Sequence, residues 1–81
     1  MRSYQFQTPV EGFDVVPSDT VDHTRPAWGI YVGVGGDVAI VTANGTVLVH
    51  KNVPAGSTIR LGSVRVNVTG TTATDMVGYI Y

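Results

Sequence analysis

The chain has 81 residues, which allows one small domain with a single core. It contains no Cys, which excludes a disulfide framework and a thiolate metal site. Its formal net charge of −1 argues against nucleic-acid binding, because a binder of this size would be plainly basic.

The charge density of the chain is low. Charged residues make up 14% of the sequence and hydrophobic residues 43%, whereas soluble domains usually contain about 25% charged residues. A small monomer has a large surface for its volume and should be more polar than average. We therefore expect other subunits to cover part of this surface.

The composition predicts strands rather than helices. The chain holds 15 Val, 10 Thr and 4 Ile, but only one Glu, one Lys and two Leu. Its longest uncharged apolar stretch, residues 27–36, is far shorter than the roughly 20 residues of a membrane span, so no membrane span is expected. Residues 1–6 lack the apolar region of a secretory signal.

Residues 1–12 differ from the rest of the chain. Tyr4, Phe6 and Thr8 alternate with polar residues, as in an edge strand or in an extended arm that becomes ordered on a partner. Aromatic side chains on such an arm are effective anchors, because each buries a large area with few torsions to freeze. Packing of Tyr4 and Phe6 on their own domain is an equal alternative. Residues 13–81 are predicted to form one β domain.

Short apolar runs separated by turn residues follow the N-terminal segment. The predicted strands cover residues 13–16, 28–34, 38–42, 46–52, 57–61, 64–69 and 75–81. Residues 18–24 are predicted to form a loop, and Asn44-Gly45 predicts a hairpin with a type I′ turn. About seven short strands without a covering helix predict an all-β fold, a small antiparallel β-sandwich or barrel of jelly-roll-like type.

Three strands carry further expectations. Gly29, Gly33 and Gly35 alternate on one face of residues 28–34, which predicts the close approach of another backbone or of a bulky side chain. Residues 38–42 are apolar on both faces and therefore suit a central position. The three valines of residues 64–69 are predicted to point inward.

Residues that could carry chemistry are few. Asp19, Asp22 and His23 lie close together, but their spacing matches no known metal loop and a solvated turn with an Asx cap is preferred. His50 is interpreted as a strand-end histidine rather than as half of a two-histidine site with His23. We therefore expect no metal, no cofactor and no catalytic residue, because none of Ser3, Ser18 and Ser57 lies in a nucleophile-elbow context.

The basic residues Lys51, Arg60 and Arg65 are interpreted as partners in surface ion pairs rather than as a nucleic-acid site.

The ordered set of turn motifs resembles a family of small virion proteins of tailed phages and gene transfer agents. Members of this family are described as head spike-base or capsid-associated proteins. The resemblance covers residues 18–81 and rests on residues 18–22 (SDTVD), 30–33 (IYVG), 36–38 (GDV), 52–56 (NVPAG) and 69–74 (TGTTAT), before a strand ending in Tyr81.

The resemblance implies a non-enzymatic structural protein at the capsid surface of a virion, assembled in the host cytoplasm. Its partners would be itself, as a pentamer or trimer, and the major capsid protein or another virion protein, without nucleic acid or membrane. A spike base would form a pentamer and a decoration protein more often a trimer. The alternative is a ligand- or glycan-binding β-sandwich with an aromatic platform. Candidate interface residues are Tyr4, Phe6, Tyr31, Tyr79 and Tyr81.

Overall fold

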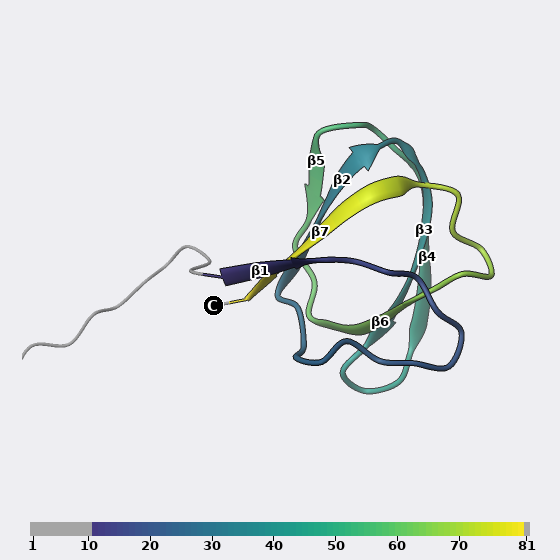
Figure 1. The fold of residues 1–81 in the computed structure, drawn as a ribbon. Helices are drawn as coiled ribbons and strands as arrows, with labels where there is room; N and C mark the ends of the chain where they lie inside the picture. Colours follow the sequence, from purple (N-terminus) through teal and green to yellow (C-terminus); the bar gives the residue numbers. More distant parts are fainter. Residues whose placement is uncertain (1–10, 81) are drawn as a thin grey trace, which may run out of the picture.

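A computed structural model describes residues 11–80 of the chain (Figure 1). This part is all-β, as the sequence predicts, with seven strands and no helix. The strands are β1 (Glu11–Asp14), β2 (Gly29–Val34), β3 (Gly36–Thr42), β4 (Val47–Val53), β5 (Ser57–Ile59), β6 (Ser63–Asn67) and β7 (Thr74–Ile80). The predicted boundary between an arm and a domain, after residue 12, falls inside β1.

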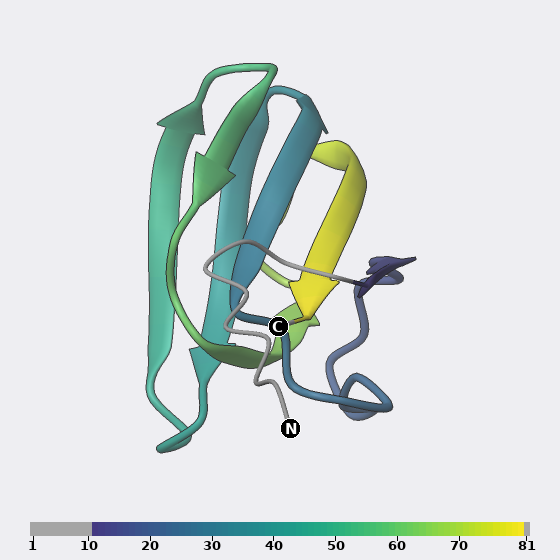
Figure 2. The same cartoon turned by 90° about the vertical axis from the view of Figure 1, so that its left-hand side faces the viewer.

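Two antiparallel sheets face each other as two layers. One sheet has four strands in the order β1-β7-β2-β5, and the other has three in the order β4-β3-β6. Residues 54–56 carry the chain from β4 in one layer to β5 in the other (Figure 2). An antiparallel bridge between Ala27 and Ser63 joins the sheets at one edge. The arrangement is therefore a small β-sandwich.

The core lies between the two sheets and is built mainly from small β-branched side chains. β2 contributes Ile30 and Val32, both fully buried, whereas Trp28 and Val34 on the same face are about half exposed at the ends of the strand. β3 is the central strand of its sheet, as predicted, and four consecutive residues of it are buried. The core cluster comprises Val15, Ala27, Ile30, Val32, Val38, Ile40, Val53, Val66, Ala73 and Met76.

The hairpin between β3 and β4 differs from the predicted type I′ turn. A type I′ turn needs a positive φ at both central residues, but only Gly45, with a φ of 87°, has one. The amide of Gly45 donates to the carbonyl of Thr42 at 2.9 Å, and the amide of Thr42 donates to Thr46 at 2.8 Å. This pattern is a type I turn followed by a left-handed glycine, the G1-bulge form of a hairpin. The prediction was wrong in turn type and correct in the position of the hairpin.

Gly33 in β2 and Gly35, just after β2, lie where other backbone comes close. A Cβ on Gly33 would stand 2.5 Å from the carbonyl oxygen of Asp75, and one on Gly35 would stand 2.7 Å from that of Val53. The predicted close approach of another backbone is therefore confirmed at both positions.

Two predicted details at the ends of strands were wrong. Val68 is 54% exposed rather than inward, because β6 ends at Asn67 and the chain turns, with the amide of Thr71 donating to the carbonyl of Val68. The first strand begins at Glu11 and ends at Asp14, two residues before the predicted end. Residues 15–28 then form an irregular segment that crosses to the edge of β6, where Ser18, His23 and Ala27 donate backbone hydrogen bonds to it.

Candidate interaction surfaces

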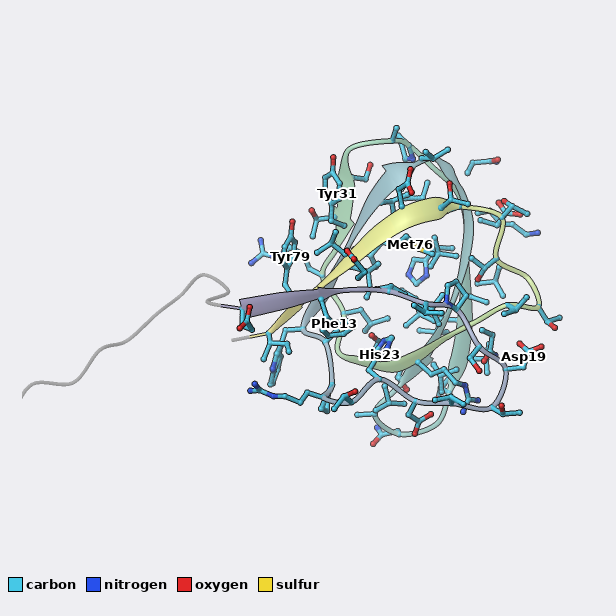
Figure 3. All side chains as sticks on the ribbon, in the orientation of Figure 1. Phe13, Asp19, His23, Tyr31, Met76 and Tyr79 are labelled. Carbon is cyan, nitrogen blue, oxygen red and sulfur yellow. The ribbon has the colours of Figure 1, made fainter. Side chains whose placement is uncertain are left out.

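Tyr31 and Tyr79 lie on the outer face of the four-stranded sheet. Tyr31 pairs with Val77 across β2 and β7, and Tyr79 pairs with Gly29, so the two tyrosines are diagonal neighbours on one face. Figure 3 shows them on the outer side of the sheet, away from Met76 in the core. Both side chains are half-buried. The structure thus places two of the five predicted interface residues on one surface.

The ring of Tyr79 lies between two glycines. Gly12 of β1 and Gly29 of β2 are the residues opposite Tyr79 in its two neighbouring strands. A Cβ on Gly12 would stand 3.7 Å from Cδ1 of the ring, and one on Gly29 would stand 3.9 Å from Cδ2. Because both neighbours are glycines, no side chain at these two positions covers the ring of Tyr79.

Tyr4, Phe6 and Tyr81, the other three predicted interface residues, lie outside the described residues.

A second apolar surface lies on β4, which is an edge strand. Three consecutive residues of β4 are exposed, Val47 by 50%, Leu48 by 42% and Val49 by 47%. Edge strands of soluble monomers usually carry charged residues or prolines that prevent pairing with another chain. An edge with three adjacent apolar side chains is typical of a surface that is covered in an assembly.

A groove of about 700 Å³ runs beside β1, and we call it the β1 groove. Its apolar part includes Val16 and Val21, exposed by 78% and 67%, with Phe13 and Ile80. Its charged residues are Glu11, Asp14, Asp22 and Arg25. The full lining is Glu11, Gly12, Phe13, Asp14, Val16, Pro17, Ser18, Val21, Asp22, His23, Thr24, Arg25 and Ile80.

His23 packs into the wall of the β1 groove. Its ring centroid lies 5.0 Å from that of Phe13, and its Nε2 lies 3.4 Å from Oγ of Ser63, within hydrogen-bonding distance. Burial lowers the pKa of His23 below its usual range, and the nearby Asp22 opposes this shift. Burial therefore favours the neutral form of His23, which packs between β1 and β6.

Ser63 and His23 form the pairing that nucleophilic catalysis uses, although the sequence prediction did not include Ser63. Oγ of Ser63 belongs to a fully buried residue, so a substrate has no access to it. The carboxylate of Asp22 points to Arg65, at 2.9 Å, instead of orienting the imidazole. The contact between Ser63 and His23 therefore contributes to packing and lacks the arrangement that acyl transfer requires.

Each member of the predicted loop cluster has its own structural partner. Asp19 accepts hydrogen bonds from the amide of Thr69 at 3.0 Å and from its hydroxyl at 2.8 Å, which hold its pKa below the usual range. Asp22 pairs with Arg65. The turn itself is capped by Ser18, whose Oγ accepts from the amides of Thr20 and Val21, and not by an Asp. Among residues 11–80, no group of three potential ligands is placed to hold a metal ion.

His50 lies in the middle of β4, opposite Val38, rather than at the end of a strand. Its Nδ1 is buried and has no hydrogen-bond partner among the described residues.

The basic residues form ion pairs in two of the three predicted cases. Lys51 lies 3.3 Å from Asp37, and Arg65 lies 2.9 Å from Asp22. Arg60 forms no ion pair with the part of the chain that the structure describes. The Lys51 ammonium is mostly exposed, so water and salt screen this pair and it contributes little to stability.

No helix within residues 11–80 is long and apolar enough to cross a membrane.

These observations define a class of protein. It is a small β-sandwich in which Tyr31 and Tyr79, the β4 edge and the β1 groove form three distinct surfaces. These three surfaces are the candidates for contact with partner molecules.

A comparison with solved structures identifies the family. One chain of the "Capsid of native GTA particle computed with C5 symmetry" is 34% identical, with a TM-score of 0.79 over 88% of this chain and 82% of that one. The protein therefore belongs to the family of that chain of the gene-transfer-agent capsid. A scan against known protein families and a search of curated proteins found no match.

Proposed function

We propose that this protein is a non-enzymatic structural component of a virion, attached to a phage-like capsid as a symmetric homo-oligomer. The observation that carries the proposal is the 34% identity, over most of both chains, to a chain of a gene-transfer-agent capsid. The apolar side chains exposed on β4 and beside β1 support it independently, because assembly would remove them from water.

Within this role, a head spike base at a fivefold vertex is the preferred form, and a threefold decoration protein is the alternative. The related capsid was computed with C5 symmetry, which is also the symmetry of a ring of five copies. A closed ring would use two different surfaces of each protomer, because its interfaces are heterologous. The outer face with Tyr31 and Tyr79 is the proposed contact with a neighbouring copy.

The test of this proposal is the absolute mass of the purified protein, measured by light scattering after size exclusion. A pentamer is the expected result, and a trimer would favour the decoration role. A monomer at every accessible concentration would contradict the homo-oligomer. Electron microscopy of particles made with and without the protein would then test the attachment. Particles that look the same in both preparations would contradict the virion role.

The second candidate is binding of a ligand or glycan on the outer face of the four-stranded sheet. The observation in its favour is Tyr79 between Gly12 and Gly29, a tyrosine ring without neighbouring side chains on those two positions. Titration of the ¹⁵N-labelled protein with oligosaccharides, followed by NMR, tests it. Shifts confined to Gly12, Gly29 and Tyr79 would support this candidate, and unchanged spectra would contradict it.

A further inference from the structure

The β1 groove holds the whole excess charge of the described domain. Residues 11–80 carry six acidic and four basic side chains, a formal charge of −2. Three of the acidic and one of the basic side chains line the groove, so the groove also has a formal charge of −2. The remaining charged side chains of the domain sum to zero. Asp22 is paired with Arg65, whereas Glu11 and Asp14 form no ion pair within residues 11–80. The groove therefore favours a positively charged occupant.

The apolar part of the β1 groove indicates that its occupant carries apolar side chains as well as a positive charge. Val16 and Val21 are the two most exposed large hydrophobic residues of the described chain, and both line the groove. Phe13 and Ile80 complete its apolar lining. An occupant that fits these features carries a positive charge beside large apolar side chains that fill the hollow.

Residues 2–8 of the chain itself have this chemistry. The segment RSYQFQT contains one cation, Arg2, two aromatic anchors, Tyr4 and Phe6, and no acidic residue. Gln5 and Gln7 supply donors for the carboxylates and carbonyls along the wall. The charge and the apolar content of the segment thus match those of the groove.

The same segment is poorly suited to its own groove. It joins the domain at Glu11, which is itself a groove residue, so a return into that groove needs a reversal at Pro9 and Val10. Two-residue hairpin turns of types I′ and II′ need positive φ angles, which proline and β-branched residues do not adopt. Proline also favours an extended conformation of the residue before it, so Pro9 directs the segment away from the domain rather than back into the same groove. Nine extended residues span about 30 Å, which is enough to reach an adjacent subunit.

We propose that residues 2–8 of one copy occupy the β1 groove of a neighbouring copy. This inference rests on the proposed homo-oligomer and names one of its contacts. The exchange is heterologous, because a donor segment meets a different acceptor surface, and repetition around a closed ring satisfies every groove.

Engineered cysteines test this contact cleanly, because the chain has no native Cys. Gln5→Cys places a thiol between the two aromatic anchors, and Thr24→Cys places one on the exposed lining of the groove. The matched control is Thr58→Cys, an exposed threonine on β5 at the opposite edge of the same sheet. Val49→Cys on β4 tests the competing acceptor. Each acceptor variant is co-expressed with the Gln5→Cys chain and oxidised.

The expected yield of disulfide heterodimer at Thr24 exceeds that at Thr58 by about tenfold, because docking raises the effective concentration of the two thiols. Equal yields would overturn the proposal, and so would preferred bonding at Val49. A chain carrying both Gln5→Cys and Thr24→Cys should form ladders of linked subunits. A purely intrachain disulfide in that chain would show that the segment occupies its own groove, against the proposal.

Charge reversal supplies a second readout. Arg2→Glu should lower the heterodimer yield, and the double change Glu11→Lys with Asp14→Lys should restore it in the Arg2→Glu background. Absence of rescue would contradict the charge pairing. The mass of the wild-type assembly separates the two proposals. An intact pentamer or trimer without crosslinks at Thr24 overturns only this contact, whereas a monomer overturns the homo-oligomer as well.

Discussion

The ring of Phe13 lies against Gly78, its partner across the ladder between β1 and β7. A Cβ on Gly78 would stand 2.6 Å from Cζ of Phe13 and 2.8 Å from Cε1. The glycine therefore gives the ring its place on the core side of the sheet, and the ring covers a backbone that has no side chain of its own. This contact ties the edge strand β1, and with it one wall of the β1 groove, to the core.

Replacing Gly78 with Ala should lower the free energy of unfolding by about 1–3 kcal/mol, because the added methyl group overpacks the site. Phe13→Leu in the same background should recover part of this loss, since the shorter leucine side chain leaves room for the added methyl group. Urea denaturation of the single and double variants measures both effects. Gly62→Ala is the control, because a Cβ there meets nothing within 4 Å. An equal loss at Gly62 would contradict the role given to Phe13.

Stability should fall as the pH drops from 7 to 5, owing to His23. Burial lowers the pKa of this histidine in the folded state, so the unfolded chain binds the proton more readily. The folded state loses stability once the pH passes below the ordinary value near 6.5, and the loss levels off below the folded pKa. In His23→Gln this part of the pH dependence should be absent, as thermal melts between pH 7 and pH 5 would show. His50→Gln should retain it.

Asp19→Asn should decouple the irregular segment after β1 from the turn at Thr69. The carboxylate accepts two hydrogen bonds from Thr69, which lower its pKa, so its contribution is present near neutral pH. That contribution is lost as the pH falls below the ordinary value of 3.8 and through the lower folded pKa.

Denaturation at pH 7 should therefore show a less stable Asp19→Asn variant, and the difference from wild type should vanish in strong acid. Asp14→Asn serves as the matched control, since Asp14 makes no ion pair within residues 11–80. A difference that persists unchanged at pH 2.5 would contradict the electrostatic origin of the effect.

Tyr79→Ala should weaken the assembly more than it weakens the fold. Aromatic residues at the centre of an interface commonly contribute about 2 kcal/mol or more, so we expect roughly a 30-fold rise in the dissociation constant of the oligomer. Light scattering over a dilution series measures this change. Val47→Ala, which truncates an exposed residue on the other sheet, is the comparison. A larger effect at Val47 would move the proposed contact from the tyrosines to β4.

Local patterns in the sequence were sufficient to predict the strands but not the surfaces. Alternation and turn residues placed all seven strands, and the apolar character of residues 38–42 predicted the central position of β3. Tyr31 and Tyr79 were predicted separately, and only the pairing of β2 with β7 makes them neighbours. The predicted turn type at Asn44 was wrong because Asn-Gly occurs both in type I′ turns and in type I turns with a G1 bulge. The flanking hydrogen bonds distinguish the two geometries.

The β1 groove was not predicted, although one signal for it is present. Val16 and Val21 stand out in the sequence as isolated apolar residues around a polar segment. Their side chains line the same groove only because the fold places β1 and residues 15–26 side by side. The partnership of His23 with Ser63 has the same origin, since 40 positions separate the two residues in the chain. Contacts of that range are set by topology rather than by local pattern.

The central place of β7 also determines when the protein can fold. This strand lies between β1 and β2, yet the ribosome makes it after the other six described strands. Until then β1 has no strand to pair with, so the four-stranded sheet closes only after residue 80 has been translated. Pairings between distant parts of a chain form slowly. An incompletely translated chain therefore leaves its core exposed, and the chain can complete its fold only once β7 has been made.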